Sequence, residues 1–262
     1  MLRMRIAVPL ANLRMPWRRA LEAAARLRAE AVEIDARGEI CPHELSQSAV
    51  RQIRKLLEDY NLRVSAVAFF TRRGYNVLSD LDRRVQATRQ AMEMAHKLGA
   101  ATVVNHVGQV PEQREGPEWD LLVETLQDLA HHGQHIGVTL AARTGSESGE
   151  SLAALITSLP EGAIGVDLDP GGLVQNGFSA SEAARSLVRY VTVVHARDAV
   201  ADRVRRRGAE APLGDGSVDF PEILGILEQA GYRGYLTVQR ESAAEPFQEL
   251  RQDIDYLRRL ER

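Results

Sequence analysis

The sequence has a single cysteine, Cys41, among 262 residues. One cysteine excludes an internal disulfide framework and any zinc site built from several cysteines. No apolar run approaches the roughly 18 residues that a membrane-spanning helix requires. The first residues are basic and then briefly apolar, but no small-residue cleavage site follows. We therefore expect a first strand rather than a signal peptide, and a cytoplasmic protein.

An excess of positive charge is also missing. The 33 lysine and arginine residues are outnumbered by 36 acidic residues, so the formal net charge is −3. A protein that binds nucleic acid through the phosphate backbone needs a basic face. This balance therefore argues against a nucleic-acid partner.

Lysine is nearly absent, because Lys55 and Lys97 are the only two and 31 of the 33 basic side chains are arginine. Both lysines fall in helical patterns rather than at strand ends. Schiff-base chemistry, which needs a desolvated lysine amine, is therefore not expected. The Gly-x-x-x-x-Gly-Lys-Ser/Thr loop that cradles phosphates is missing as well.

The sequence does contain a regular alternation of short apolar runs with helical patterns. The runs are rich in Val, Ile and Ala, which is typical of parallel strands buried on both faces. Eight strands are predicted, at residues 5–10, 31–34, 63–69, 102–105, 138–141, 164–168, 191–195 and 235–238. Eight β/α units of about 33 residues predict an α/β fold, a single (β/α)8 TIM barrel over residues 1–262. The main alternative is a doubly wound open sheet, but its usual glycine-rich turn is missing from residues 11–17.

The predicted helices each show one apolar stripe and recognisable ends. In the helix expected at residues 82–98, one face carries Val85, Thr88, Met92 and Ala95. Ser179 and Asp219 begin capping-box patterns of two later helices. Glycine marks three expected helix ends, at Gly99, Gly133 and Gly231.

In a barrel of this kind, ligand sites form where the strands end and the next loops begin. Polar residues gather at these points: Glu33, Asp35, Arg72, Arg73, Asn105, His106, Arg143, Asp167, Asp169, His195, Arg197, Asp198, Gln239 and Glu241. Such a mouth suits a hydroxylated or anionic small molecule. The alternative is a set of buried ion pairs that only closes the barrel. We favour the ligand site, because desolvated charges are costly without a use.

Two other groups resemble reactive sites. His131, His132 and His135 have metal-ligand spacing, but they fall between the expected fourth helix and fifth strand, at the opposite end of the barrel. We interpret them as exposed histidines near a helix end. Cys41 and His43 follow the second strand, where a thiolate nucleophile is one interpretation and inert filler the commoner one.

Two loops could attract an anion. Residues 205–207 form an arginine run in the long loop after the seventh strand, and we favour a solvated loop there. Gly214 and Gly216 precede a helix, where glycine can expose backbone amides to an anion. A tight turn into the helix explains these glycines at least as well.

Four segments carry a resemblance to a known family, at residues 84–99, 194–198, 212–220 and 231–241. There the sequence resembles the xylose isomerase-like TIM-barrel superfamily, which includes sugar phosphate isomerases/epimerases and AP endonuclease family 2 proteins. The resemblance implies one divalent metal at the mouth. Its ligands would be a Glu ending strand five, an Asp ending strand six, a His ending strand seven and a Glu ending strand eight. Asp169 and His195 match the aspartate and histidine positions.

The two glutamate positions depart from the family pattern. They hold Arg143 and Gln239, which changes the formal charge of the site by about +3. An arginine side chain does not ligate metals and stays protonated. We therefore predict no tightly bound metal, and expect Arg143 to pair with Asp169 as a built-in cation. Should the site prove competent, Mn²⁺, Zn²⁺ or Mg²⁺ would be the candidates.

The resemblance implies a sugar or sugar phosphate isomerase/epimerase-like protein acting on, or binding, a small polyhydroxylated or anionic metabolite. The catalytic candidates are His195, Asp169, His106 and Glu241. The substrate-binding candidates are Glu33, Arg72, Asn105, Arg143, Arg197 and Gln239. Among these side chains, histidine and a buried glutamate can exchange protons near neutral pH.

A pseudoenzyme that binds the metabolite without turnover is the close alternative, because both family glutamates are missing. Whether the protein is an enzyme stays open at this point. DNA repair of the AP endonuclease kind is less favoured, since that chemistry uses several metal ions. We expect no membrane or nucleic-acid partner, and the chain could form a homodimer.

Overall fold

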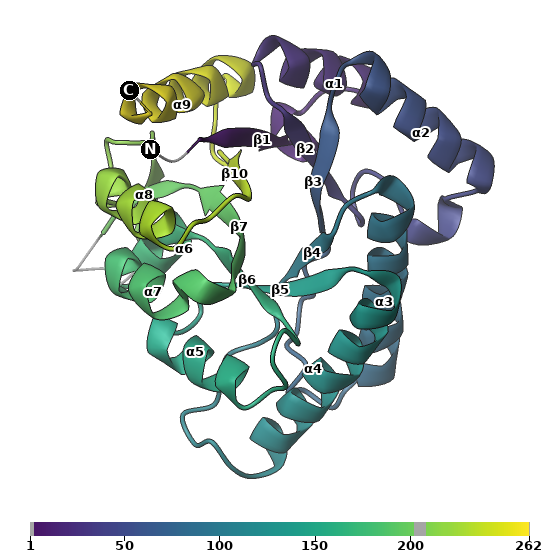
Figure 1. Ribbon diagram of the computed structural model, residues 1–262, viewed down its shortest axis with the longest axis vertical. Coiled ribbons are helices and arrows are strands. Elements are labelled where there is room, and N and C mark those ends of the chain that lie inside the picture. The colour runs from purple at the N-terminus through teal and green to yellow at the C-terminus, as the bar shows by residue number, and fades with distance from the viewer. Residues whose placement is uncertain (1–2, 202–207, 262) are drawn as a thin grey trace.

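The computed structural model describes residues 3–201 and 208–261. Eight parallel strands close into a barrel, and helices form a ring around it (Figure 1). The barrel strands are β1 (Arg5–Pro9), β2 (Ala31–Asp35), β3 (Arg63–Ala68), β4 (Thr102–Asn105), β5 (Thr139–Arg143), β6 (Gly165–Leu168), β7 (Val191–Ala196) and β10 (Tyr235–Val238). Each predicted strand is confirmed to within two residues. The (β/α)8 barrel is therefore confirmed, and the doubly wound sheet was the wrong alternative.

Helices follow the strands in the expected alternation. The α-helices of the described residues are α1 (Trp17–Arg26), α2 (Gln47–Asp59), α3 (Leu81–Leu98), α4 (Pro117–Ile136), α5 (Gly149–Thr157), α6 (Pro170–Gln175), α7 (Ala180–Leu187), α8 (Phe220–Gln229) and α9 (Pro246–Leu260). Short 3₁₀ helices are η1 (Leu10–Leu13), η2 (Pro42–Glu44) and η3 (Val188–Tyr190). The short α6 adds one helix to the predicted eight, because both α6 and α7 lie between β6 and β7.

The loop after β7 contains an element that the sequence pattern did not predict. Strands β8 (Asp198–Val200) and β9 (Ala209–Ala211) pair antiparallel as a separate two-stranded sheet. Each has only three residues, too few for a recognisable alternation. The predicted solvated arginine run at residues 205–207 lies outside the described residues.

A cluster of small side chains lies inside the barrel. Ala66 and Ala68 of β3 pack there with Val104, Ala141 and Val193 from three other strands. Because side chains alternate along a strand, the residues two positions further on also face the barrel axis. Phe70 packs against this cluster in that way. The alternation therefore selects which polar residues reach the mouth, the end at which the strands terminate.

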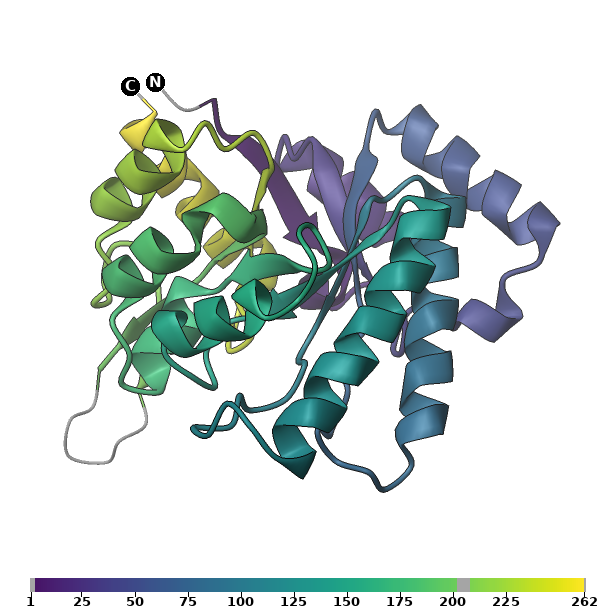
Figure 2. The same ribbon diagram turned by 60° about the horizontal axis from the view of Figure 1, so that its bottom comes forward.

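The predicted end of the fourth helix was wrong. Gly133 lies inside α4, and the left-handed cap is Gly137, with φ +72°. A Cβ on Gly133 would lie 2.2 Å from the Val138 carbonyl oxygen, so glycine is needed there for close packing of α4 on the start of β5. His131, His132 and His135 consequently lie on the last turns of α4, which packs beside α3 (Figure 2). His131 and His135 are exposed, as our interpretation expected.

Other local predictions are confirmed. Ser179 Oγ accepts a hydrogen bond from Glu182 N at the start of α7, and Asp219 Oδ1 accepts one from Glu222 N at the start of α8. Gly99 caps α3 with φ +80°. Over residues 3–201 and 208–261, no helix combines the length and the apolar character that crossing a membrane demands.

Candidate active site at the barrel mouth

Arg143 lies at the centre of the mouth and binds the side chains that end two other strands. Its Nε and Nη2 atoms donate to Asp169 Oδ2 at 3.1 and 3.0 Å, and Nη2 also donates to Gln239 Oε1 at 2.6 Å. The Arg143 side chain is only 4% exposed. The predicted pairing of Arg143 with Asp169 is therefore confirmed, and the guanidinium bridges β5, β6 and β10.

A second chain of contacts lies next to Arg143. His195 Nδ1 is 2.6 Å from Asp167 Oδ1, and His195 Nε2 is 3.0 Å from Glu33 Oε2. Asp167 Oδ2 also lies 3.7 Å from Arg143 Nε. All of these side chains are buried. The imidazole is thus held between two carboxyl groups, one on each of its nitrogens.

These contacts set the protonation states. Burial alone would lower the pKa of His195, but the charges of Asp167 and Glu33 outweigh it and raise that pKa to about 9. Burial alone would raise the pKa of Asp169, but Arg143 and Arg197 lower it to about 2. At neutral pH the imidazole is therefore protonated and the Asp169 carboxyl is ionised.

We call six of these groups the mouth cluster: Glu33, Arg143, Asp167, Asp169, His195 and Arg197. Three are carboxyl groups and three are cations, so their formal charges cancel. Each is buried, and each contacts a group of opposite charge. Buried charges are tolerated when they are paired in this way.

Asp169 is positioned by the start of α6. Its Oδ1 accepts a hydrogen bond from Gly172 N at 2.8 Å, and its own backbone N–H donates to Thr144 Oγ1 at 2.8 Å. A Cβ on Gly172 would lie 2.7 Å from Asp169 Oδ2, so only glycine fits against the carboxylate. Both carboxylate oxygens are therefore engaged, Oδ1 by a helix N-terminus and Oδ2 by guanidinium groups.

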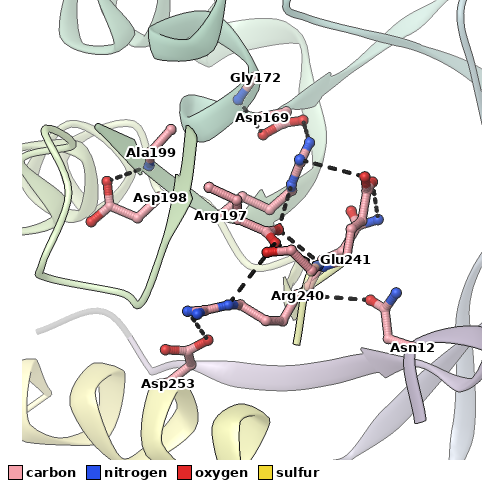
Figure 3. Close-up of polar contacts among 12 residues, drawn as sticks. Asn12, Asp169, Gly172, Arg197, Asp198, Ala199, Arg240, Glu241 and Asp253 are labelled. Carbon is pink, nitrogen blue, oxygen red and sulfur yellow. Dashed lines mark hydrogen bonds and ion pairs between the residues drawn. The ribbon is translucent and has the colours of Figure 1, made fainter. Parts of the chain in front are cut away.

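Arg197 links Asp169 to the exposed Glu241 at the outer edge of the mouth (Figure 3). Its Nη1 donates to Asp169 Oδ2 at 2.7 Å, while Nε lies 3.7 Å from Glu210 Oε1 and Nη2 lies 3.8 Å from Glu241 Oε2. Glu210 comes from β9 and also accepts hydrogen bonds from the backbone of Glu241 and Ser242. Glu210 was not among the predicted site residues, because a strand of three residues is too short to show a recognisable alternation.

Arg240 extends the same network away from the mouth. Its Nη1 lies 3.7 Å from Asp253 Oδ2 of α9 (Figure 3). Its Nη2 lies 3.2 Å from Glu249 Oε2 of the same helix. Burial raises the pKa of Asp253 to about 6, although the Leu213 N–H and Arg240 act against it. These contacts tie the end of β10 to the last helix.

His106 and Glu241 are the exposed members of the site. The His106 ring packs on Phe70, with centroids 4.8 Å apart, and Arg143 Cζ lies 5.1 Å from the centre of the same Phe70 ring. Partial desolvation, and then the Arg143 charge, lower the pKa of His106, so its ring is neutral at pH 7. Glu241 is 57% exposed and accepts a hydrogen bond from Gln239 Nε2 at 3.0 Å. A proton-accepting imidazole and a carboxylate thus border the same mouth.

Two predicted binding residues lie away from this cluster. Asn105 is fully buried, where its Oδ1 accepts from Thr71 N and its Nδ2 donates to Tyr75 Oη. These bonds join β4 to the loop after β3, so Asn105 has a structural role. Arg72 is exposed and lines a separate cavity of about 370 Å³ beside α3.

Two other candidate motifs also have structural explanations. Asp198 Oδ2 accepts hydrogen bonds from Gly214 N at 3.0 Å and Gly216 N at 3.1 Å, while Oδ1 accepts one from Val218 N at 3.0 Å. The anion that these glycine amides bind is therefore this carboxylate of the chain itself. Cys41 is half-buried, with its Sγ 3.7 Å from the Arg37 carbonyl oxygen.

The mouth residues, as arranged, do not fit a divalent metal. Asp169 Oδ2 already contacts three guanidinium nitrogens, and both His195 nitrogens face carboxyl oxygens. A protonated imidazole and a saturated carboxylate are poor ligands, because metals bind the deprotonated groups. Within the part of the chain that the structure describes, no three His, Cys, Asp or Glu side chains group into a metal-binding arrangement. The absence of a bound metal stays a prediction.

Fold and mouth together define a TIM barrel with a charged site at the carboxyl ends of its strands. The chain belongs to the xylose isomerase-like TIM-barrel family, whose model matches residues 21–260. The resemblance found in the sequence is thereby confirmed.

Three known proteins to which the chain is similar are described by their identity and coverage. It is 26% identical over 225 residues to an inosose dehydratase of Clostridium botulinum, covering 73% of this chain and 74% of that protein. A xylose isomerase domain protein from Planctomyces limnophilus has a crystal structure with a TM-score of 0.86 and 26% identity, covering 98% and 96% of the two chains. A xylose isomerase-like protein from Mycobacterium smegmatis, solved with magnesium, has a TM-score of 0.77 and 17% identity, covering 99% and 96%. At that identity the last comparison shows the shared fold alone.

Proposed function

We propose that the protein binds a small polyhydroxylated or anionic metabolite at the barrel mouth and acts on it as a metal-independent, isomerase/epimerase-like enzyme. The observation that carries this proposal is Arg143, which holds Asp169 and Gln239 through its guanidinium nitrogens. A fixed guanidinium at this place can stabilise negative charge that develops on a substrate oxygen. The Clostridium relative supports the substrate class, since its name specifies an inosose.

Proton transfer in this proposal uses the exposed groups of the mouth. Removing a proton next to a carbonyl needs a base whose pKa lies near or below the working pH. His106 meets this requirement, because desolvation and the Arg143 charge keep its ring neutral. Glu241 supplies a second carboxyl group at the same rim, held by Gln239 Nε2. We assign His106 as the general base and Glu241 as its partner.

The buried members have a different role in the proposal. His195 and Asp169 are engaged on both nitrogens and both oxygens, so neither is free to exchange a proton with substrate. Asp169 holds Arg143 and Arg197 in place. His195 holds Asp167, which lies beside Arg143. In this proposal His195 and Asp169 are positioning residues rather than catalytic ones.

A metabolite-binding protein without turnover is the second candidate. It is favoured by the pairing of every buried carboxyl group of the mouth cluster with a cation. With those carboxyl groups occupied, His106 and Glu241 are the two of the four catalytic candidates that are left to perform chemistry. The two candidates therefore differ in whether these two residues move a proton.

The experiment that separates them follows exchange of carbon-bound hydrogen in D₂O by NMR, with EDTA-treated protein. The probes are an inosose, a ketohexose and a ketohexose phosphate. The enzyme proposal predicts exchange in EDTA, reduced about 100-fold or more in His106→Gln and Glu241→Gln. The control His135→Gln, at an exposed position in the last turn of α4, should exchange at the wild-type rate. Exchange that requires added metal would refute the metal-independent reaction.

Binding is measured in parallel by thermal shift, because a ligand that binds only the folded state raises its stability. Binding without exchange would support the second candidate. Both candidates would be contradicted if no polyhydroxylated or anionic probe shifted the melting temperature and none exchanged its carbon-bound hydrogen.

A further inference from the structure

A cavity of about 830 Å³ opens at the end of the barrel opposite the mouth, where β1, β3 and β10 begin. We call it the basal pocket. Its charged lining consists of Arg3, Arg5, Arg28, Glu30, Arg63 and Arg233. We propose that the basal pocket binds a small phosphorylated organic anion that carries two or three negative charges. This site shares no residue with the mouth.

The charges of the lining do not cancel. Glu30 is the one carboxylate among five arginines, and it already lies 3.6 Å from Arg3 and 3.8 Å from Arg5. The C-terminal ends of α1 and α2 also border the pocket, and together they contribute about −1. The pocket therefore carries about +3, whereas the whole chain has a formal charge of −3. Arg28, Arg63 and Arg233 have no ion pair anywhere in residues 3–201 and 208–261.

One wall of the pocket is held rigidly. The Arg5 guanidinium carbon lies 3.9 Å above the Tyr235 ring centre, and Arg5 also donates hydrogen bonds to Tyr235 Oη and to the Arg233 carbonyl. A guanidinium fixed in this way presents its remaining N–H groups in one direction. Planar guanidinium groups bind phosphate oxygens in pairs, which favours a phosphorylated ligand.

The backbone at Arg28 gives an independent argument. Arg28 follows the end of α1 in the left-handed region, with φ +57°. At the corresponding left-handed positions the chain uses Gly99 after α3, Gly137 after α4 and Asn61 after α2. Glycine takes this conformation without strain, whereas arginine does not. A contact between the Arg28 side chain and a bound anion would offset this strain.

The shape of the basal pocket favours a small ligand over a polymer. Its volume lies within the range of small-molecule sites, about 300 to 1,000 Å³. An extended nucleic acid would also contact the surrounding surface, and a chain with net charge −3 opposes this. A compact phosphate monoester or diphosphate ester, which carries about two or three negative charges near neutral pH, matches both the volume and the charge.

The test is isothermal titration of the full chain with inorganic pyrophosphate and with ADP, in magnesium-free buffer. We expect one site, with affinity reduced about tenfold or more by Arg63→Gln and by Arg28→Gly. Arg28→Gly should also raise the melting temperature, because it relieves the positive φ, so weaker binding would not reflect misfolding. The matched control is Arg51→Gln, which removes the same charge from an exposed site on α2 outside the pocket.

Three results would overturn the proposal. The first is an absence of binding of either probe to the wild-type chain. The second is equal weakening by Arg51→Gln and Arg63→Gln, which would indicate attraction to overall charge alone. The third is loss of binding in Arg83→Gln but not in Arg63→Gln, because Arg83 lines the separate cavity beside α3. None of these results bears on the mouth, since the two sites have no residue in common.

Discussion

Replacing Arg143 and Gln239 together by glutamate tests whether the guanidinium stands in the place of a metal. The formal charges of the mouth cluster cancel in the wild-type chain. Arg143→Glu changes that sum by −2, and Gln239→Glu adds a further −1, so the double variant carries −3. Asp169 and Asp167 lose a cation that lies 3.0 and 3.7 Å away. The double variant is therefore expected to be much less stable without metal.

The size of the effect follows from the burial of these groups. Removing one partner of a buried ion pair costs about 3–5 kcal/mol. An unfolding entropy near 2.1 cal/mol/K per residue makes this a fall of about 5–9 °C in the melting temperature of a 262-residue chain. A divalent ion returns two positive charges. At about 100 times its dissociation constant it should restore about 2.7 kcal/mol, or about 5 °C.

The assay is calorimetry with and without Mn²⁺, in buffers treated with EDTA, together with metal analysis of the dialysed protein. The control Arg143→Gln loses the cation and gains no carboxylate. It should be destabilised yet give no response to Mn²⁺. Circular dichroism establishes that each variant is folded. A folded double variant that ignores Mn²⁺, or a wild-type chain that gains a comparable shift, would refute the reasoning.

Three further predictions concern the same framework. Since the pKa of His195 is raised from 6.5 to about 9, its stabilisation is complete below about pH 6.5 and is lost as the pH rises through 9, about 3 kcal/mol in all. Urea unfolding between pH 6 and 10 measures this loss, and a flat profile would contradict it. Asp198→Asn should cost about 1–3 kcal/mol by weakening the bonds to four backbone amides, whereas Asp215→Asn, at an exposed position, should not, by the same unfolding assay. Gly133→Ala should destabilise by about 1–3 kcal/mol through its clash with a carbonyl oxygen, whereas Gly225→Ala, with open space around it in α8, should stabilise. Equal melting temperatures for the two alanine variants would argue against the close packing of α4 on the start of β5.

The barrel itself was predictable because its strands are buried on both faces. Buried parallel strands read as short apolar runs, and those runs located all eight barrel strands to within two residues. Gly133 could not be predicted in the same way. Its requirement for glycine comes from the Val138 carbonyl across a tertiary contact, which no local pattern encodes.

The candidate site was predictable in part. The departure of Arg143 from the family pattern was visible in the sequence, and it led directly to the pairing with Asp169. The structure places Asn105 outside the mouth, and the alternation of side chains along β4 could have predicted this. Alternation along β4 puts Val104 inside the barrel, so His106 faces the mouth and Asn105 faces the helices.

Two residues of the mouth, Glu210 and Phe70, were not predicted from the sequence. Glu210 reaches the mouth only because β8 and β9 pair and carry it across to Glu241 and Ser242. Phe70 was detectable, since it continues the alternation of Ala66 and Ala68. To predict which polar residues act together, it is therefore necessary to know which face of its strand each residue occupies as well as where the strand ends.

The closure of the barrel by β1 and β10 has a consequence for how the chain folds. The two strands pair Arg5 with Tyr235, so the last seam joins residues 230 positions apart. Closing so long a loop costs more chain entropy than joining any other neighbouring strand pair, so we expect this seam to form late in assembly. Arg5 and Tyr235 also line the basal pocket, one from each side of the seam. An anion held there would clamp the seam shut and slow the opening of the barrel, so that occupancy of the pocket would prolong the lifetime of the folded state.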